Sequence, residues 1–150
     1  MNFERFTEVS GFFKILPEDW QEGIIPFWET YKASTNCYVL SENNQIIAGG
    51  LVFSIVPPDM IYAKDEANSW LEKGYLYVGF IYVLEEKRGH NLGSMWLNEL
   101  KKMHPAQNYW LTIEDLELDK FYVKNDFKMV ESLYNNGVEE GLYVYMCSRC

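Results

Sequence analysis

The sequence predicts an α/β protein with α+β character, in which a mixed β-sheet carries helices on both of its faces. Three observations predict this fold. Strand-like and helix-like segments follow one another in the order β-α-β-β-α-β-α-β-α-β-β along 150 residues. The run from Tyr75 to Leu84 is wholly uncharged and has the length and the β-branched and aromatic content of a central strand. This run opens a strand–helix–strand unit, whose two strands should be parallel.

The N-terminal third is expected to hold a strand, a helical segment and a hairpin. Residues 2–9 are the first strand candidate. Residues 16–20 (LPEDW) indicate a helix start, because proline is tolerated in a first turn and acidic side chains favour the positive helix end. Two strands, over 37–40 and 46–56, then flank the polar turn at 42–45.

The remaining elements follow the same reasoning. A helix is expected over 59–72, because Gly74 can take the left-handed conformation that closes a helix. A second helix over 91–103 ends before Pro105 and leads to a strand over 109–113. The last elements are a short helix carrying Leu118, Phe121 and Tyr122, and a hairpin of strands 127–134 and 142–146 around Asn135-Asn136-Gly137. No repeat or linker divides the chain, so residues 1–150 should form one domain.

Charge and composition exclude several classes of function. Lys and Arg total 13 and Asp and Glu total 22, which gives a net charge of −9 and disfavours nucleic acid as a partner. This charge suits cationic partners such as amines, and it also keeps a protein soluble. No stretch approaches the roughly 18 apolar residues of a membrane-spanning helix. The N-terminus is charged early and has no apolar signal core, so we expect a cytoplasmic protein.

We expect no metal site. The C-x-x-C spacing of Cys147 and Cys150 falls at the chain end, and only His90 and His104 could add imidazole ligands. The two cysteines are therefore interpreted as incidental.

The segment with the clearest chemical signal joins the uncharged strand to the next helix; it reads Arg88-Gly89-His90-Asn91-Leu92-Gly93-Ser94. Main-chain N–H groups at a helix N-terminus are unsatisfied donors, and the helix dipole adds positive charge. Gly89 and Gly93 would let the main chain approach a ligand, and Asn91 tolerates a left-handed conformation. The combination fits a phosphate or pyrophosphate but matches neither a Walker loop nor a G-x-G-x-x-G fingerprint. A tight turn without a ligand is the alternative.

Two motifs in this region resemble those of the GNAT (GCN5-related) N-acetyltransferases. Residues 88–93 (RGHNLG) are similar to the [QR]-x-x-G-x-[GA] loop by which that family binds the pyrophosphate of acetyl-CoA. Residues 121–128 (FYVKNDFK) resemble its Tyr-x-x-x-G-F pattern. Asn91 and Asp126 replace family glycines, and both residue types tolerate the required backbone shape. By motif the resemblance covers residues 78–128, and by order of elements it covers essentially the whole chain.

The resemblance implies a fold and an activity. The sheet should be mostly antiparallel, with its fourth and fifth strands parallel and splayed apart. The protein should transfer an acetyl group from acetyl-CoA directly to a primary amine of a small molecule or protein, in a ternary complex and without a metal. The implied cofactor-binding residues are Ile81, Val83, Arg88, Gly89, His90, Asn91, Leu92, Gly93 and Ser94. The main chain near Ile81 and Val83 would pair with the pantetheine arm.

The resemblance also assigns the general acid and leaves the base open. Tyr122 matches the family's general-acid tyrosine, and a core aromatic is the alternative. Many relatives carry a glutamate on the fourth strand, but Tyr75 to Leu84 contains no carboxylate. The alternatives for the base are Glu114, Asp115, Tyr75, Tyr77 and a water relay.

Several functional alternatives stay open at this point. The fold could serve as a non-catalytic acyl-CoA-binding sensor or scaffold, or accept a longer acyl chain. The acidic helix over 59–72 could wall the acceptor pocket or could be an amphipathic cover with a solvated face. The expected partner is a small-molecule or peptide amine, of cationic character, and a homodimer is left open.

Overall fold

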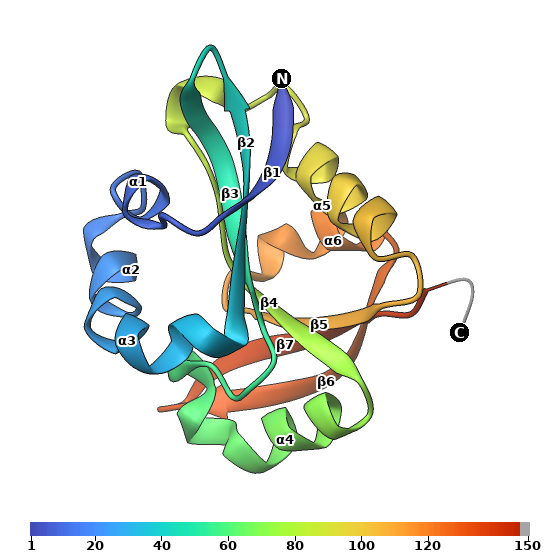
Figure 1. Ribbon diagram of the computed structural model, residues 1–150. Coiled ribbons are helices and arrows are strands. Elements are labelled where there is room, and N and C mark those ends of the chain that lie inside the picture. Colours follow the sequence, from blue (N-terminus) through green and yellow to red (C-terminus); the bar gives the residue numbers. More distant parts are fainter. Residues whose placement is uncertain (148–150) are drawn as a thin grey trace.

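A computed structural model describes residues 1–147 and arranges them around a seven-stranded sheet (Figure 1). The strands are β1 (Asn2–Phe6), β2 (Thr35–Glu42), β3 (Gln45–Phe53), β4 (Tyr75–Val83), β5 (Asn108–Ile113), β6 (Phe127–Asn135) and β7 (Val138–Tyr145). Their order in the sheet is β1-β2-β3-β4-β5-β7-β6. Neighbours pair antiparallel except β4 and β5, which are parallel. The mixed, mostly antiparallel sheet predicted from the sequence is confirmed.

Helices cover both faces of this sheet, as predicted. They are α1 (Ser10–Phe13), α2 (Glu18–Glu22), α3 (Trp28–Tyr31), α4 (Lys64–Glu72), α5 (Leu92–Met103) and α6 (Asp119–Lys124). Short 3₁₀ turns complete them: η1 (Ile25–Phe27), η2 (Lys32–Ser34), η3 (Pro58–Ala63), η4 (Glu85–Lys87) and η5 (Leu116–Leu118). In Figure 1, α1–α3 lie on one side of the strands and α5 and α6 on the other.

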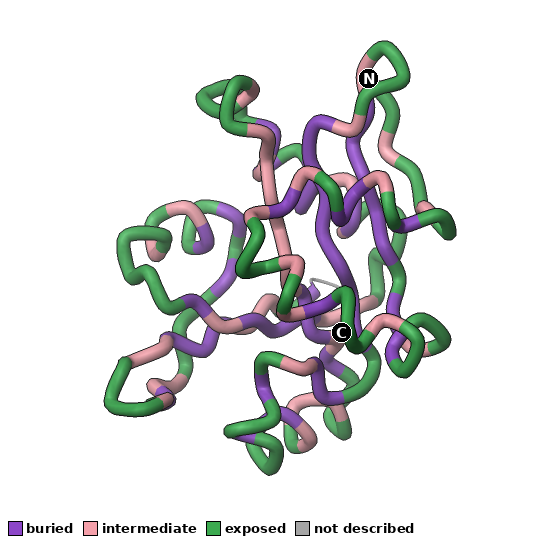
Figure 2. The backbone as a smooth tube through the Cα atoms, turned by 90° about the vertical axis from the view of Figure 1, so that its left-hand side faces the viewer, coloured by how far each residue is buried: buried purple, intermediate pink, exposed green. Residues whose placement is uncertain are grey.

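Each face of the sheet has its own hydrophobic core. Phe12, Met60 and Ala67 pack on one face, from α1, η3 and α4, whereas Trp96 and Leu100 of α5 pack on the other. Strand side chains alternate between the two cores, as Cys37 and Tyr38 do. In Figure 2 the buried residues are concentrated in the interior segments of the chain and the exposed residues in its outer turns.

Several predicted boundaries need correction. The predicted helix over 59–72 is the 3₁₀ turn η3 followed by α4, because Ala63 (φ −123°, ψ 44°) interrupts the helical conformation between them. The first strand ends at Phe6, before its predicted end at residue 9. The C-terminal hairpin turns on Asn136 and Gly137, both at positive φ, as an Asn-Gly turn requires. Cys150 of the C-x-x-C pair lies outside the described residues.

Strands β4 and β5 pair over only a short length. Three residue pairs join them, Tyr75 with Asn108, Leu76 with Tyr109 and Tyr77 with Trp110. Beyond Tyr77 the two strands part: in Figure 1, β4 continues toward the β2–β3 hairpin while β5 runs beside β7. The parallel, splayed pair is thus confirmed. Among residues 1–147, no helix has both the length and the apolar character needed to cross a membrane.

Candidate active site

A cleft of about 520 Å³ opens where β4 and β5 part. Its walls come from the diverging halves of the two strands and from the elements that pack across the gap. They include Val78–Ile81 of β4, Leu111–Ile113 of β5, Trp20 of α2, Asp59 of η3, Tyr122 of α6 and Glu140 of β7. Main-chain groups on the facing sides of the parted strands lack a neighbouring strand here, so an extended ligand can pair with them. Of the two strand residues expected beside the pantetheine arm, Ile81 lies in this wall and Val83 does not line the cleft.

A β-bulge shapes the β4 side of the cleft. Gly49 and Leu51 of β3 pair with Tyr82 and Gly79 of β4, so β4 carries one extra residue in this interval. Phe80 stands there with a φ of 56°, which is rare for a bulky side chain. The rings of Trp20 and Phe53 pack against Phe80 at centroid distances of 6.1 and 6.2 Å. The bulge changes the direction of the strand beside the cleft, where a ligand would contact its main chain.

The loop before α5 has the backbone shape predicted for an anion-binding turn. Gly89 (φ 83°) and Asn91 (φ 64°) are both left-handed. The first helical hydrogen bond is donated by the Met95 N–H to the Asn91 carbonyl at 3.0 Å. The N–H groups of Leu92, Gly93 and Ser94 therefore precede the helical ladder and are free to bind an anion. Residues 88–91 are exposed.

Arg88 and His90 stabilise this turn. Arg88 Nε donates to the Val83 carbonyl at 3.2 Å, and its guanidinium lies 5.3 Å from the Tyr82 ring centroid. His90 Nδ1 lies 3.1 Å from the carbonyl oxygens of both Lys87 and Arg88, so it carries the proton and donates. The positive charge of Arg88 thus stands at the end of β4, in the segment that leads to α5.

Residues 92–94 offer main-chain groups at this turn, because the side chains of Leu92 and Ser94 are buried and Gly93 has none. Leu92 belongs to the core beneath α5. The buried Ser94 hydroxyl accepts a hydrogen bond from Asn125 Nδ2 at 3.0 Å. A Cβ on Gly93 would meet Phe121 Cζ at 2.9 Å. The glycine therefore permits α5 to contact α6, and the close approach of a ligand to Gly93 stays a prediction.

Tyr122 lies in the cleft wall with its hydroxyl unpaired. The residue is buried, and burial raises the pKa of its phenol to about 12. Within residues 1–147, the buried side-chain N and O atoms without a partner are Thr35 Oγ1 and Trp110 Nε1. The Tyr122 hydroxyl also has no hydrogen bond, yet it is not among them, so its oxygen is reached from the cleft. It is a protonated donor at neutral pH, and no acceptor among residues 1–147 takes its proton.

The four residues considered as a general base differ in whether they line the cleft and in what they contact. Tyr75 packs on Trp70 with ring centroids 5.1 Å apart, in the paired part of β4 and outside the cleft. Glu114 and Asp115 are exposed at the cleft rim. Asp115 Oδ1 accepts the Glu117 N–H at 3.0 Å and caps η5. Tyr77 does line the cleft, but it donates its hydroxyl proton to Asp59 Oδ2 at 3.1 Å.

Asp59 also lines the cleft, although the sequence does not single it out as a site residue. Solvent reaches it through the cleft, while the surrounding walls desolvate its carboxylate. This desolvation raises the Asp59 pKa to about 6. The hydrogen bonds from its own main chain and from Tyr77 lower the pKa, and the charge of Glu140 raises it further. Asp59 does belong to the acidic segment 59–72, for which a place in the wall of the acceptor pocket is one of the two expectations from the sequence.

The cleft is strongly acidic. Five carboxylates line it, and Lys, Arg and His are absent from the described residues around it; the five are Asp19, Asp59, Glu114, Asp115 and Glu140. Such a field attracts cations and repels anionic acceptors. Positive charge is instead found at the anion-binding turn, with Arg88.

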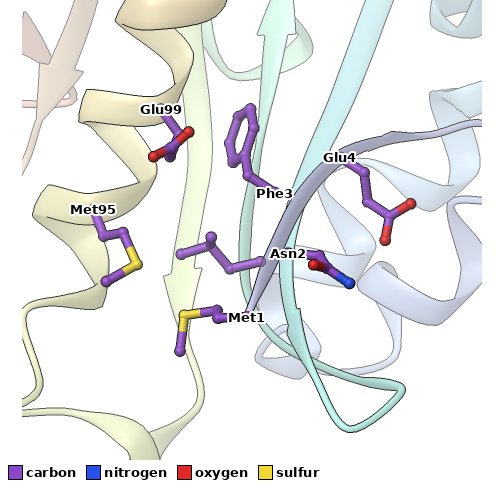
Figure 3. A pocket seen from close by; sticks show the side chains of 7 residues that line it. Met1, Asn2, Phe3, Glu4, Met95 and Glu99 are labelled. Carbon is purple, nitrogen blue, oxygen red and sulfur yellow. The ribbon is translucent and has the colours of Figure 1, made fainter.

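A second hollow of about 400 Å³ lies between β1 and α5 and contains no predicted site residue. Figure 3 shows Phe3 and Met95 facing it from the two elements. In the described part of the chain, no group of three or more His, Cys, Asp or Glu residues is arranged to hold a metal ion.

Comparisons with known proteins bear on the cleft and the turn. A family model described as the acetyltransferase (GNAT) family matches residues 6–127. A search among curated proteins finds no match.

Solved structures resemble the whole chain. An aminoglycoside 6'-acetyltransferase type Ii has a TM-score of 0.70 and 14% identity, covering 97% of each chain. An acyl-CoA N-acyltransferase from Pseudomonas aeruginosa has a TM-score of 0.67 and 12% identity, covering 97% of this chain and 99% of that one. A GNAT family acetyltransferase from Elizabethkingia anophelis with acetyl-CoA bound has a TM-score of 0.62 and 14% identity, covering 97% of each chain. At these identities the likeness establishes a common fold.

Proposed function

The chain belongs to the acetyltransferase (GNAT) family, and on that premise we propose that it transfers the acetyl group of acetyl-CoA to the primary amine of a cationic small molecule or peptide. The observation that carries the proposal is the unpaired, protonated Tyr122 hydroxyl inside the cleft between β4 and β5. A phenol in that position can donate a hydrogen bond to a departing thiolate.

The residues present fit acetyl-CoA in two places. The N–H groups of residues 92–94 and the Arg88 side chain fit a diphosphate at the start of α5. The parted strands offer main-chain partners to the extended pantetheine arm, from Ile81 on β4. When bound there, acetyl-CoA supplies an activated acyl group in thioester linkage.

The chain's own residues then orient and activate the acceptor. The acidic cleft attracts an ammonium group and places it beside the β4 bulge. Trp20 and Phe80 add an aromatic wall on the same side, which suits an acceptor with an apolar portion. The acceptor loses a proton before it attacks, because only the neutral amine has a free lone pair. Tyr122 donates toward the sulfur as the carbon–sulfur bond breaks.

The test is a thiol-release assay with purified protein, acetyl-CoA and a panel of amines. The panel contains polyamines, amino acids, peptides and an aminoglycoside, the last because one similar structure is an aminoglycoside acetyltransferase. We expect thiol release together with a product heavier by one acetyl group for at least one cationic amine. The matched control is that amine in its fully N-methylated quaternary form, which keeps the charge but cannot be acetylated. Binding of acetyl-CoA without turnover across the panel would favour the non-catalytic sensor instead.

A further inference from the structure

A hydrogen-bonded chain fixes one carboxylate in the cleft wall. The buried Tyr77 hydroxyl donates to Asp59 Oδ2 at 3.1 Å and lies 3.2 Å from Thr112 Oγ1. Tyr77 has one hydroxyl proton and an ionised carboxylate only accepts, so the single Thr112 hydroxyl proton is shared between the Tyr77 oxygen and the Met60 sulfur, which lies 3.5 Å from Thr112 Oγ1. The chain thus joins η3, β4 and β5 at the last residue pair between the two strands, where they begin to part.

The local packing determines where Tyr77 points. Its ring lies over Gly79, where a Cβ would come within 2.8 Å of Tyr77 Cε2. The ring also packs on Trp110 with a centroid distance of 4.6 Å. A side chain at residue 79 would displace the ring, so the glycine allows the hydroxyl to reach Asp59. Within residues 1–147, Tyr77 is the side chain that hydrogen bonds to Asp59, and Asp59 Oδ1 is left without a side-chain partner.

From this geometry we propose that Asp59 is the general base that removes a proton from the acceptor's ammonium group, and that Tyr77 is its positioning residue. The inference rests on the proposed acetyltransferase function and goes beyond it by assigning the base. Asp59 is preferred to Glu114 and Asp115 because the Tyr77 hydroxyl holds its carboxylate in place and the cleft walls desolvate it, whereas Asp115 caps η5.

Asp59 takes one proton from the ammonium group, and the freed lone pair forms a bond to the thioester carbonyl carbon. The carbon–sulfur bond breaks, and the sulfur takes a proton from Tyr122. The second proton lost by the nitrogen returns to the Tyr122 oxygen. The products are an N-acetylated amine and free CoA thiol, and Asp59 then releases its proton to solvent.

The surroundings of Asp59 improve it as a base. Desolvation raises its pKa from about 3.8 to about 6, which brings it about two units closer to an alkylammonium. The titratable groups that face it are Tyr77 of β4, Glu140 of β7, Tyr31 of α3 and Tyr62 of η3. The three tyrosines stay protonated at neutral pH, because each has a pKa raised above its ordinary value. The Glu140 charge acts in the same direction as desolvation.

The test compares five variants on one acceptor amine, by kcat and by the pH profile of kcat. Because the amine is the same throughout, its own titration cancels between enzymes. In the wild-type protein we expect kcat to fall about tenfold per pH unit below about pH 6, as Asp59 becomes protonated. In Asp59→Asn we expect kcat to fall by about 10²-fold or more, the acid limb to disappear and acetyl-CoA affinity to be unchanged. Asp59→Glu should restore part of the rate. The matched control Asp65→Asn removes an exposed acid of α4 outside the cleft and should stay within about twofold of wild type.

Tyr77→Phe tests the positioning role without removing the carboxylate. The hydrogen bond from Tyr77 lowers the Asp59 pKa, so its loss should move the acid limb to higher pH while Asp59 still acts. This variant also decides the matter if Asp59→Asn fails to fold. An acid limb of the kcat profile that stays at the wild-type pH in Tyr77→Phe would overturn the assignment of Asp59 as the base.

The other outcomes are equally decisive. A wild-type rate that survives in Asp59→Asn overturns the inference alone. Loss of the acid limb in Glu114→Gln, with Asp59→Asn retaining it, transfers the role to Glu114. Absence of turnover in the wild-type protein overturns the proposed function and this inference with it.

Discussion

Replacing Tyr122 by phenylalanine tests how the cleft handles the departing sulfur. Burial raises the Tyr122 pKa to about 12, whereas a thiol titrates near 8.5. Full proton transfer from this phenol to a thiolate is therefore uphill by about 3.5 units, or about 5 kcal/mol. A hydrogen bond to the developing thiolate contributes about 1.5–3 kcal/mol instead. Tyr122 should thus act first as a hydrogen-bond donor that stabilises the negative charge developing on the sulfur. Transfer of its proton to the sulfur follows.

This magnitude sets the expected loss of rate. We expect kcat of Tyr122→Phe to fall by about 10- to 150-fold, which corresponds to 1.5–3 kcal/mol. The free energy of unfolding should change by about 0.5 kcal/mol or less, because no hydrogen bond joins the Tyr122 hydroxyl to another of the described residues. Acetyl-CoA affinity, measured by calorimetry, should stay within about twofold.

The assay is thiol release at saturating amine, with urea unfolding measured in parallel. The matched control is Tyr134→Phe, which removes a phenol that is 66% exposed on β6, outside the cleft. A Tyr122→Phe rate within twofold of wild type would refute the donor role. A loss of rate matched by an equal loss of acetyl-CoA affinity would refute it as well, since that result indicates a binding contact.

Three further changes follow from the same structure. Asn91→Ala should lower the free energy of unfolding by about 1 kcal/mol, because alanine is strained at the left-handed φ of 64°, whereas Asn91→Gly should be neutral; urea unfolding measures both. Gly93→Ala should destabilise by about 1 kcal/mol, since the clash of its methyl with Phe121 (about 1–3 kcal/mol) exceeds the gain in helix propensity, and Phe121→Leu should relieve the effect. Asp59→Asn should raise the melting temperature more at pH 7.5 than at pH 4.5. The folded Asp59 pKa of about 6 lies above its unfolded value, so the folded state binds this proton more tightly and unfolding becomes easier as pH rises through 6; an equal shift at both pH values would contradict this.

Local chemistry made much of the fold predictable. The uncharged run at 75–84 became β4 at Tyr75–Val83, in the middle of the sheet. Asn136-Gly137 produced a hairpin, because both residues accept positive φ. The left-handed Asn91 was predicted for the same reason. In each case a few neighbouring residues determine the conformation.

Features that depend on distant contacts were not predictable. Nothing near Phe80 in the sequence indicates its positive φ, which accompanies the β3–β4 register and the packing of Trp20. The role of Asp59 depends on Tyr77, 18 residues away, and on a break at Ala63 that helical spacing does not reveal. The contact of Gly93 with Phe121 was not predictable either, because Phe121 lies on another helix.

The short pairing of β4 with β5 gives this sheet two edges in its interior besides β1 and β6 at its outer limits. Exposed strand edges invite pairing with foreign chains and hence aggregation, and proteins commonly protect them with charge. The five carboxylates around the opening place such protection at the interior edges. The acidity that suits an ammonium group therefore also discourages a stray polypeptide from adding itself as an eighth strand.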